Sequence, residues 1–155
     1  MARKTVFVKV SGDMLKNASF LTWLEGIAHA QYVTLCIGGG TQINEEFARR
    51  GLPVTKHGPL GRETGTLEER QIARNVLEQN AAKCEDELES QGIHARVFIP
   101  VLEIGGVLCH VNGDQMVRTA YLGYDELVVI TTPDRLEKKQ MEFKDLPKVL
   151  VYAFE

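Results

Sequence analysis

The sequence predicts an α/β fold: a mostly parallel sheet with helices on both faces, giving three layers. Short runs rich in β-branched residues alternate with longer segments whose apolar residues recur every three or four positions. Glycine-containing turns separate the two kinds of segment, as is typical of parallel strands joined by helices. The 155 residues are expected to form one domain, residues 1–155, around one sizeable core.

Each expected element rests on composition and spacing. The first strand is a run of β-branched and aromatic residues interrupted by one lysine, and the longest helix ends before Gly92. Residues 52–66 are rich in glycine and proline and are expected to form an extended loop. The expected strands cover residues 5–10, 32–37, 95–101, 107–111, 127–132 and 149–152. Two helices are expected over residues 19–30 and 67–91. A third is expected to begin at the N-cap Thr41 and to stop at Gly51, and a fourth to follow Asn112-Gly113-Asp114 and end near residue 122.

Composition excludes several classes of function. The net charge of −3 gives no electrostatic reason for nucleic acid or an anionic membrane to be a partner. The apolar run near the N-terminus is too short for a signal peptide or a membrane span, so a cytoplasmic location is expected. The three cysteines lie far apart in apolar segments and are expected to be buried, reduced thiols. The four histidines lack metal-ligand spacing, so no metal site is expected.

Lys9 is the first candidate for a ligand contact, with Gly12 following it. A lysine inside an apolar strand is unusual, because a buried ammonium needs a partner. At the carboxyl end of the strand, Lys9 can reach the crevice where α/β sheets bind ligands and can pair with a phosphate there. The alternative is a lysine whose stem lies along the protein while its ammonium is solvated.

The second candidate is the triple glycine Gly38, Gly39 and Gly40, which joins an expected strand to an expected helix. Glycines let backbone amides approach a ligand closely, and the positive end of a helix attracts anions. The segment is neither the phosphate loop that ends in Gly-Lys-Ser/Thr nor the dinucleotide fingerprint. Anion binding is the interpretation favoured here, and a flexible turn is the alternative.

Arg62, Asn112 and Asp114 complete the candidate set. Arg62 lies in the long loop before the longest helix and could hold a carboxylate or phosphate through two hydrogen bonds. A solvated loop arginine is the alternative. Asp114 opens a helix, where it could cap the helix or hold a cation such as Lys9 in position. Capping is the commoner role for an aspartate at such a place.

Four segments in this order resemble the amino acid kinase family, most closely its acetylglutamate kinase branch. They cover nearly the whole chain. The matching segments are Val8-Lys9-Val10-Ser11-Gly12, Gly38-Gly39-Gly40-Thr41-Gln42-Ile43-Asn44, Gly61-Arg62-Glu63-Thr64 with the Thr-Leu-Glu that follows, and Val111-Asn112-Gly113-Asp114-Gln115. The resemblance implies an amino-acid-kinase-like domain corresponding to the family's N-terminal, acceptor-binding half.

The resemblance also implies roles. Lys9 would be catalytic, stabilising charge on a transferred phosphoryl group, and Asp114 would be catalytic by organising Lys9. Gly12 and the triple glycine would bind the phosphate, while Arg62 and Asn112 would bind the acceptor. Such a kinase would use ATP, with Mg²⁺ bridging the nucleotide phosphates.

The chain departs from the family pattern at its C-terminal end. Where the family has Asp-x-Asp-Gly after a strand, this chain has Thr132-Pro133-Asp134-Arg135, and the resemblance therefore leads us to expect that the family's nucleotide-binding lobe is largely absent. His110 also replaces an asparagine that usually binds substrate in the acetylglutamate kinase branch. Lys138, Lys139 and Lys144 are expected to be solvated surface residues rather than a second catalytic lysine.

These observations leave three hypotheses open. The first is a binding module for a small anionic metabolite, degenerate as a kinase. The second is an ATP-dependent phosphotransferase acting on a carboxylate or phosphate, completed by oligomerisation or a partner chain. The third is a structural domain without a ligand. A symmetric homo-oligomer is also expected, because a domain without its second lobe would expose apolar surface.

Overall fold

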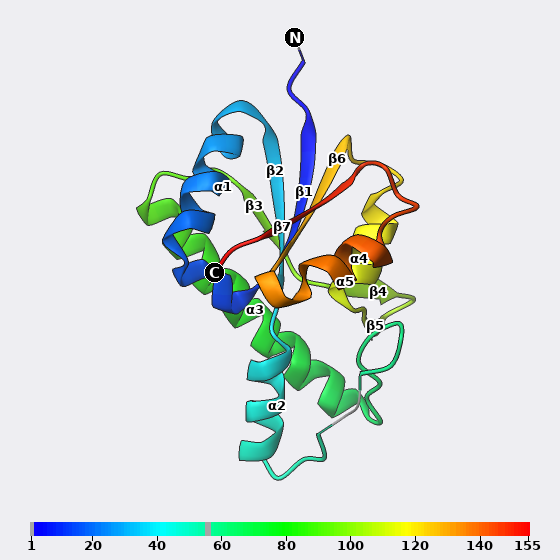
Figure 1. The fold of residues 1–155 in the computed structure, drawn as a ribbon. Helices are drawn as coiled ribbons and strands as arrows, with labels where there is room; N and C mark the ends of the chain where they lie inside the picture. The colour runs from blue at the N-terminus through cyan, green and yellow to red at the C-terminus, as the bar shows by residue number, and fades with distance from the viewer. Residues whose placement is uncertain (1, 55–56) are drawn as a thin grey trace.

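A computed structural model describes residues 2–54 and 57–155 (Figure 1). It confirms the α/β fold: a five-stranded sheet in the order β3-β2-β1-β6-β7, all parallel, with helices on both faces. The sheet strands are β1 (Thr5–Ser11), β2 (Tyr32–Gly38), β3 (Arg96–Phe98), β6 (Glu126–Thr131) and β7 (Val149–Ala153). The helices are α1 (Ala18–Ala30), α2 (Gly40–Arg49), α3 (Leu67–Ser90), α4 (Gly113–Ala120) and α5 (Leu136–Glu142). Short 3₁₀ turns, η1 (Gly12–Lys16) and η2 (Pro133–Arg135), precede α1 and α5.

Alternating side chains of the central strands build two cores, one on each face of the sheet. On one face, Val8 and Val10 of β1 pack in a cluster that includes Leu24 of α1 and Leu88 of α3. On the other face, Phe7 packs in a cluster with residues of α4 and β6. Because β1 is buried on both faces, its sequence is a nearly continuous apolar run, as parallel strands require.

A third, smaller core joins α2 to the N-terminal half of α3. Ile43 and Phe47 of α2 are buried in a cluster with Ile72 and Leu77 of α3. In Figure 1, α2 and the first half of α3 extend below the carboxyl edge of the sheet, and the second half of α3 runs up beside it. This packing fixes the direction in which α2 leaves β2, and therefore the position of the glycines between them.

The strand expected over residues 95–101 is divided in the structure. β3 ends at Phe98, and a separate antiparallel hairpin follows, made of β4 (Val101–Ile104) and β5 (Val107–His110). Pro100 lies at the break, and proline has no N–H with which to continue a ladder of hydrogen bonds. The interruption was therefore visible in the sequence and was missed.

Two further observations bear on function. Helix α5 was not expected, and it packs against β7 and places Phe143 in the core. Among the helices of the described residues, none is long and apolar enough to cross a membrane.

Candidate functional site

The candidate residues Lys9, Gly12 and Gly38 lie at the carboxyl edge of the sheet. Lys9 is near the end of β1, beside Cys36 of β2 and Val129 of β6 in the ladder, and its side chain is 24% exposed. Gly12 follows the end of β1, and a Cβ there would lie 3.5 Å from the Gly38 carbonyl oxygen. Parallel strands thus bring the first two sequence segments together, as the order of elements implied.

Asp114 holds two lysines at this edge. Its Oδ1 lies 3.7 Å from Lys9 Nζ, and its Oδ2 accepts a 2.5 Å hydrogen bond from Lys139 Nζ. Lys139 also bonds Glu142 Oε2 at 3.2 Å. The prediction that Lys139 is a solvated surface residue was wrong, because it is only 6% exposed, whereas Lys138 and Lys144 are exposed.

The electrostatics of this lysine–aspartate cluster follow from burial and from the two ammonium groups. Burial alone would raise the pKa of Asp114, but Lys9 and Lys139 outweigh it and hold the pKa below its usual value. Burial lowers the pKa of Lys9, and the Asp114 carboxylate opposes part of that effect. The cluster is therefore a partly desolvated set of charges in which the carboxylate is the shared counter-ion.

Helix α4 is capped by Asn112, not by Asp114. The Asn112 side-chain oxygen accepts hydrogen bonds from the Asp114 and Gln115 backbone N–H groups, at 2.9 and 3.4 Å. Of the two roles considered for Asp114, capping is therefore excluded, and its carboxylate lies beside Lys9. Because asparagine already satisfies the helix start, the Asp114 carboxylate is available to the two lysines. Asn112 Nδ2 also donates to the Pro59 carbonyl oxygen at 3.5 Å.

Close packing explains why one residue of the triple glycine, Gly39, has no side chain. A Cβ on Gly39 would lie 2.5 Å from Asn80 Nδ2 and 3.0 Å from Leu77 Cδ2, so α3 approaches too closely for a side chain there. Gly39 precedes α2 without a side-chain cap, and Gly40 is the first residue of the helix. The first N–H groups of α2 therefore have no side-chain acceptor from the capping residue.

Arg62 is buried against α2 rather than solvated. Its Nη1 donates to Asn44 Oδ1 at 2.8 Å, and its Nη2 donates to the Gly40 carbonyl oxygen at 3.3 Å. Nη2 also lies 2.9 Å from His57 Nε2. Burial, and then the Arg62 guanidinium, lower the pKa of His57, so a neutral ring can accept this hydrogen bond. Arg62 thus links the long loop to the start of α2, and its role toward an acceptor stays a prediction.

The sequence interpretation missed Lys139 although a signal existed. Leu136 lies three residues before it and Phe143 four residues after it, which puts all three on one helical face. A helix assigned over residues 136–142 would have turned Lys139 toward the sheet. Among the described residues, no group of three or more His, Cys, Asp or Glu side chains could hold a metal ion.

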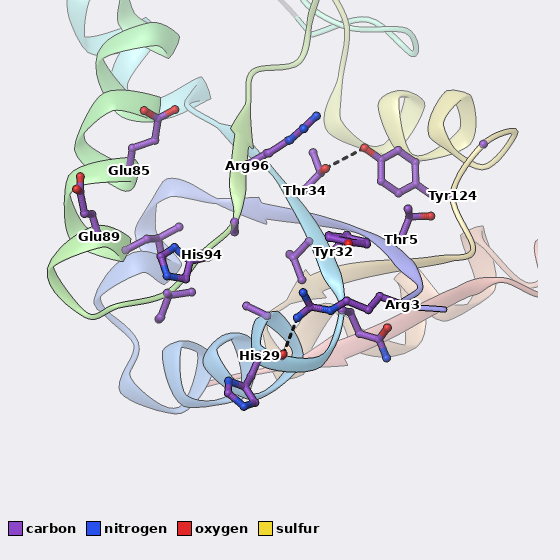
Figure 2. A pocket seen from close by; sticks show the side chains of 17 residues that line it. Arg3, Thr5, His29, Tyr32, Thr34, Glu85, Glu89, His94, Arg96 and Tyr124 are labelled. Atoms are coloured by element: carbon purple, nitrogen blue, oxygen red, sulfur yellow. Dashed lines mark hydrogen bonds between the residues drawn. The ribbon is translucent and has the colours of Figure 1, made fainter. Parts of the chain in front are cut away.

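Two open cavities lie away from the lysine–aspartate cluster. A groove of about 980 Å³ adjoins Gly12 and runs between η1, α1 and α3, with Asn80 and Gln42 among its polar lining residues. A larger groove of about 1290 Å³ lies at the opposite, amino edge of the sheet (Figure 2). Figure 2 shows Glu85 and Glu89 of α3 on one side of it and Arg3 and Tyr32 on the other. Because charges of both signs line this larger groove, its electrostatics favour neither an anionic nor a cationic ligand. The carboxyl edge of the sheet is therefore the better candidate site.

Comparisons with known proteins show the fold. No family model matches the chain, and no curated protein sequence matches it. The chain is similar to the crystal structure of N-acetylglutamate synthase from Neisseria gonorrhoeae complexed with coenzyme A and L-arginine, with a TM-score of 0.62 and 12% identity. That likeness covers 84% of this chain but only 45% of the synthase chain. The chain is also similar to smu.665 from Streptococcus mutans UA159, with a TM-score of 0.65 and 12% identity over 95% of this chain and 94% of that one.

These findings correct the family assignment. The structures that resemble this chain are an N-acetylglutamate synthase and the smu.665 protein, and neither is described as an amino acid kinase. The identification as an amino-acid-kinase domain, and the kinase functions drawn from it, are therefore withdrawn. The resemblance misled because the matching motifs are short turns between a strand and a helix. In this structure, packing against α3 accounts for Gly39 and capping of α4 accounts for Asn112, so neither residue requires a role in phosphoryl transfer.

Proposed function

We propose that the chain binds a small anionic molecule at the carboxyl edge of its sheet, with Lys9 as the charged contact. One observation carries the proposal. Within the described residues, the Lys9 ammonium has a single ion pair, at 3.7 Å, and no hydrogen bond. An ammonium has three donors, and leaving them unsatisfied in a largely buried position is costly. An anionic ligand would supply the missing acceptors.

The charge around Asp114 supports an anion rather than a cation. Lys9, Lys139 and Arg118 act on Asp114, and Arg135 acts on Lys9, whereas Asp114 and Glu142 are the carboxylates paired there. Four cations against two carboxylates leave an excess of positive charge. The start of α2, which follows the strand beside β1, adds the favourable end of a helix dipole.

The first ligands to test follow from the comparisons. The Neisseria gonorrhoeae synthase is described in complex with coenzyme A and L-arginine. Coenzyme A carries phosphates and L-arginine carries a carboxylate, so both contain a group that Lys9 could bind. Inorganic phosphate tests binding of a phosphate group without the rest of coenzyme A, and glutamate tests binding of a carboxylate without the guanidinium of L-arginine.

Lys9→Ala should abolish the stabilisation that a ligand gives. At about a hundred times its Kd, a ligand of the folded state adds about 2.7 kcal/mol, which raises the melting temperature measurably. We expect at least one of these four compounds to produce such a shift in the unsubstituted chain, and Lys9→Ala to lose it. The exposed Lys138 is a matched control on α5, and Lys138→Ala should keep the shift. A shift of equal size in Lys9→Ala, or no shift with any of the four, would contradict the proposal.

Gly113→Ala should weaken ligand binding more than it weakens the fold. A Cβ on Gly113 would lie 2.6 Å from Lys9 Cε and 3.2 Å from Lys9 Cγ. Because the lysine side chain is flexible, it can move aside, but it then leaves its position beside Asp114. We expect a roughly tenfold loss of affinity by isothermal titration calorimetry, because a hydrogen bond to a charged group contributes about 1.5 kcal/mol or more. Unchanged affinity would mean that the ligand does not depend on this placement of Lys9.

The state of the cysteines supports a cytoplasmic location as part of the proposal. Cys36 and Cys84 are buried free thiols, and burial raises the pKa of each to about 12. Reduced thiols of this kind are typical of proteins in a reducing compartment.

A further inference from the structure

His110 is a buried histidine at the end of the β4–β5 hairpin. It is the last residue of β5, it pairs with Val101 of β4, and only 9% of it is exposed. Its ring reaches α3, where Nε2 lies 2.9 Å from the Arg70 carbonyl oxygen. Because a carbonyl oxygen can only accept a hydrogen bond, Nε2 must carry the hydrogen of the neutral ring. Nδ1 is therefore the atom at which this side chain can take up a further proton.

The surroundings of Nδ1 oppose a proton. This nitrogen is buried, and among the described residues it has no hydrogen-bond partner. Protonation would create a buried N–H group that carries charge and has no acceptor, which is costly. The charges that act most strongly on the ring are also positive: Arg62 of the long loop, and Arg70 and Arg74 of α3. Burial, helped by these guanidiniums and opposed by the Arg70 carbonyl, lowers the pKa of His110.

The other titratable groups on the packed elements do not compensate. Glu69 of α3 accepts a hydrogen bond from a loop N–H, and Glu103 of β4 is exposed. His57 of the loop lies against a guanidinium, and Cys109 donates to a carbonyl oxygen of its own strand. None of these groups bonds Nδ1. A proton on His110 therefore lacks a counter-charge in direct contact within the described chain.

The hairpin is a segment that can respond to this cost. β4 and β5 form a two-stranded sheet separate from the main one. Such a hairpin is marginally stable alone, so its position depends on what it packs against. β5 contacts α3 and buries Leu108 and His110, whereas Ile104 and Val107 beside its turn are exposed. A penalty on the contact between His110 and α3 therefore acts first on the attachment of this hairpin.

We propose that His110 is a pH-sensitive switch, in which protonation of Nδ1 releases the β4–β5 hairpin from α3. The released ring is hydrated and takes up a proton at the usual histidine value, near pH 6.5. The attached state is therefore fully favoured above that value and loses stability as the pH falls below it. Release also disturbs the start of α4, because its cap, Asn112, lies two residues beyond β5.

Hydrogen exchange of the unsubstituted chain, followed by mass spectrometry, tests the release. Rates at pH 7.5 and pH 5.5, each corrected for the intrinsic rate, report the open fraction. Proton uptake by the released ring should raise that fraction up to about tenfold between the two pH values. We expect this acceleration in peptides from residues 101–112 and not in those from β1 and β6. An acceleration below about twofold in residues 101–112, or an equal one in β1 and β6, overturns the proposal.

His110→Gln separates the proton from the hydrogen bond. A glutamine amide can donate to the Arg70 carbonyl oxygen, as Nε2 does, but it cannot take up a proton in this range. We expect the corrected exchange of residues 101–112 in this variant to be the same at both pH values. His94→Gln, at an exposed position before β3, is the matched control and should keep the acceleration. Acceleration that persists in His110→Gln, or that disappears in His94→Gln, overturns the assignment to His110.

Discussion

Gly61→Ala should destabilise the fold by about 3 kcal/mol or more, the largest single effect expected in this chain. Gly61 has φ of +158°, and a Cβ there would lie 2.0 Å from the His110 carbonyl oxygen and 2.8 Å from Asn112 N. These neighbours are backbone atoms held in place on both sides, since Arg62 N–H donates to the His110 carbonyl oxygen and Asn112 N–H to that of Leu60. Neither can move without breaking the junction of β5 and α4. Urea denaturation followed by circular dichroism measures the loss.

Gly26→Ala is the control for the Gly61 substitution. Gly26 lies on the exposed side of α1, and no atom lies within 4 Å of a Cβ built there. Alanine in a helix interior should stabilise the protein by about 0.5–1 kcal/mol relative to glycine. If Gly61→Ala unfolds at the same urea concentration as the unsubstituted chain, residues 60–62 do not pair with residues 110–112.

Asp114→Asn should cost about 2–4 kcal/mol of stability, because it leaves the buried Lys139 ammonium and the partly exposed Lys9 ammonium without their shared counter-ion. Lys139 lies 2.5 Å from the carboxylate and is almost fully buried, so water cannot replace the lost charge there. Lys9 is partly exposed and contributes less. The surface carboxylate Glu46, paired with Arg49 and Arg50, provides a control, and Glu46→Gln should change the urea midpoint little.

The same carboxylate predicts a dependence on pH. Because the pKa of Asp114 in the folded protein lies below its usual value, its contribution is fully present above that usual value, near pH 4. The contribution falls as the pH drops through the folded-state pKa. The unsubstituted chain should therefore lose stability below about pH 4 more steeply than Asp114→Asn does. Parallel curves for the two proteins would mean that Asp114 is not held ionised by the lysines.

Sequence reasoning predicted the sheet because the strands that matter are buried on both faces. Residues 5–10 and 127–132 are apolar at nearly every position, and such short runs are typical of parallel strands covered on both faces. The short connections were harder, since the break at Pro100 and the helix over residues 136–142 involve weak local signals. Both features determine which way side chains point. The missed helix over residues 136–142 is the reason that Lys139 was predicted to be solvated.

The placement of Lys9 beside Asp114 was predicted, whereas the family assignment was wrong. Lys9 and Asp114 lie together because Lys9 is near the carboxyl end of β1 and Asp114 is in the first turn of α4, which packs against β1. The glycine and asparagine motifs were given a phosphate-binding role, but packing against Asn80 and capping of α4 account for Gly39 and Asn112. Motifs of three to five residues reflect the local geometry of a turn, and proteins with unrelated functions contain the same turns.

The central position of β1 has a consequence for how the molecule assembles. β1 precedes the other strands of the sheet in the sequence, yet its neighbour β6 lies far along the chain, and Thr5 bonds Asp125 across 120 positions. The lysine–aspartate cluster likewise combines the start of the sequence with its last third. Such long-range closure slows folding, because the entropy of a large loop is lost before the contacts form. The candidate site should therefore be absent from partly folded chains in which only the N-terminal half is compact. A ligand bound at Lys9 should accordingly slow global unfolding of the protein and should not merely protect a local segment.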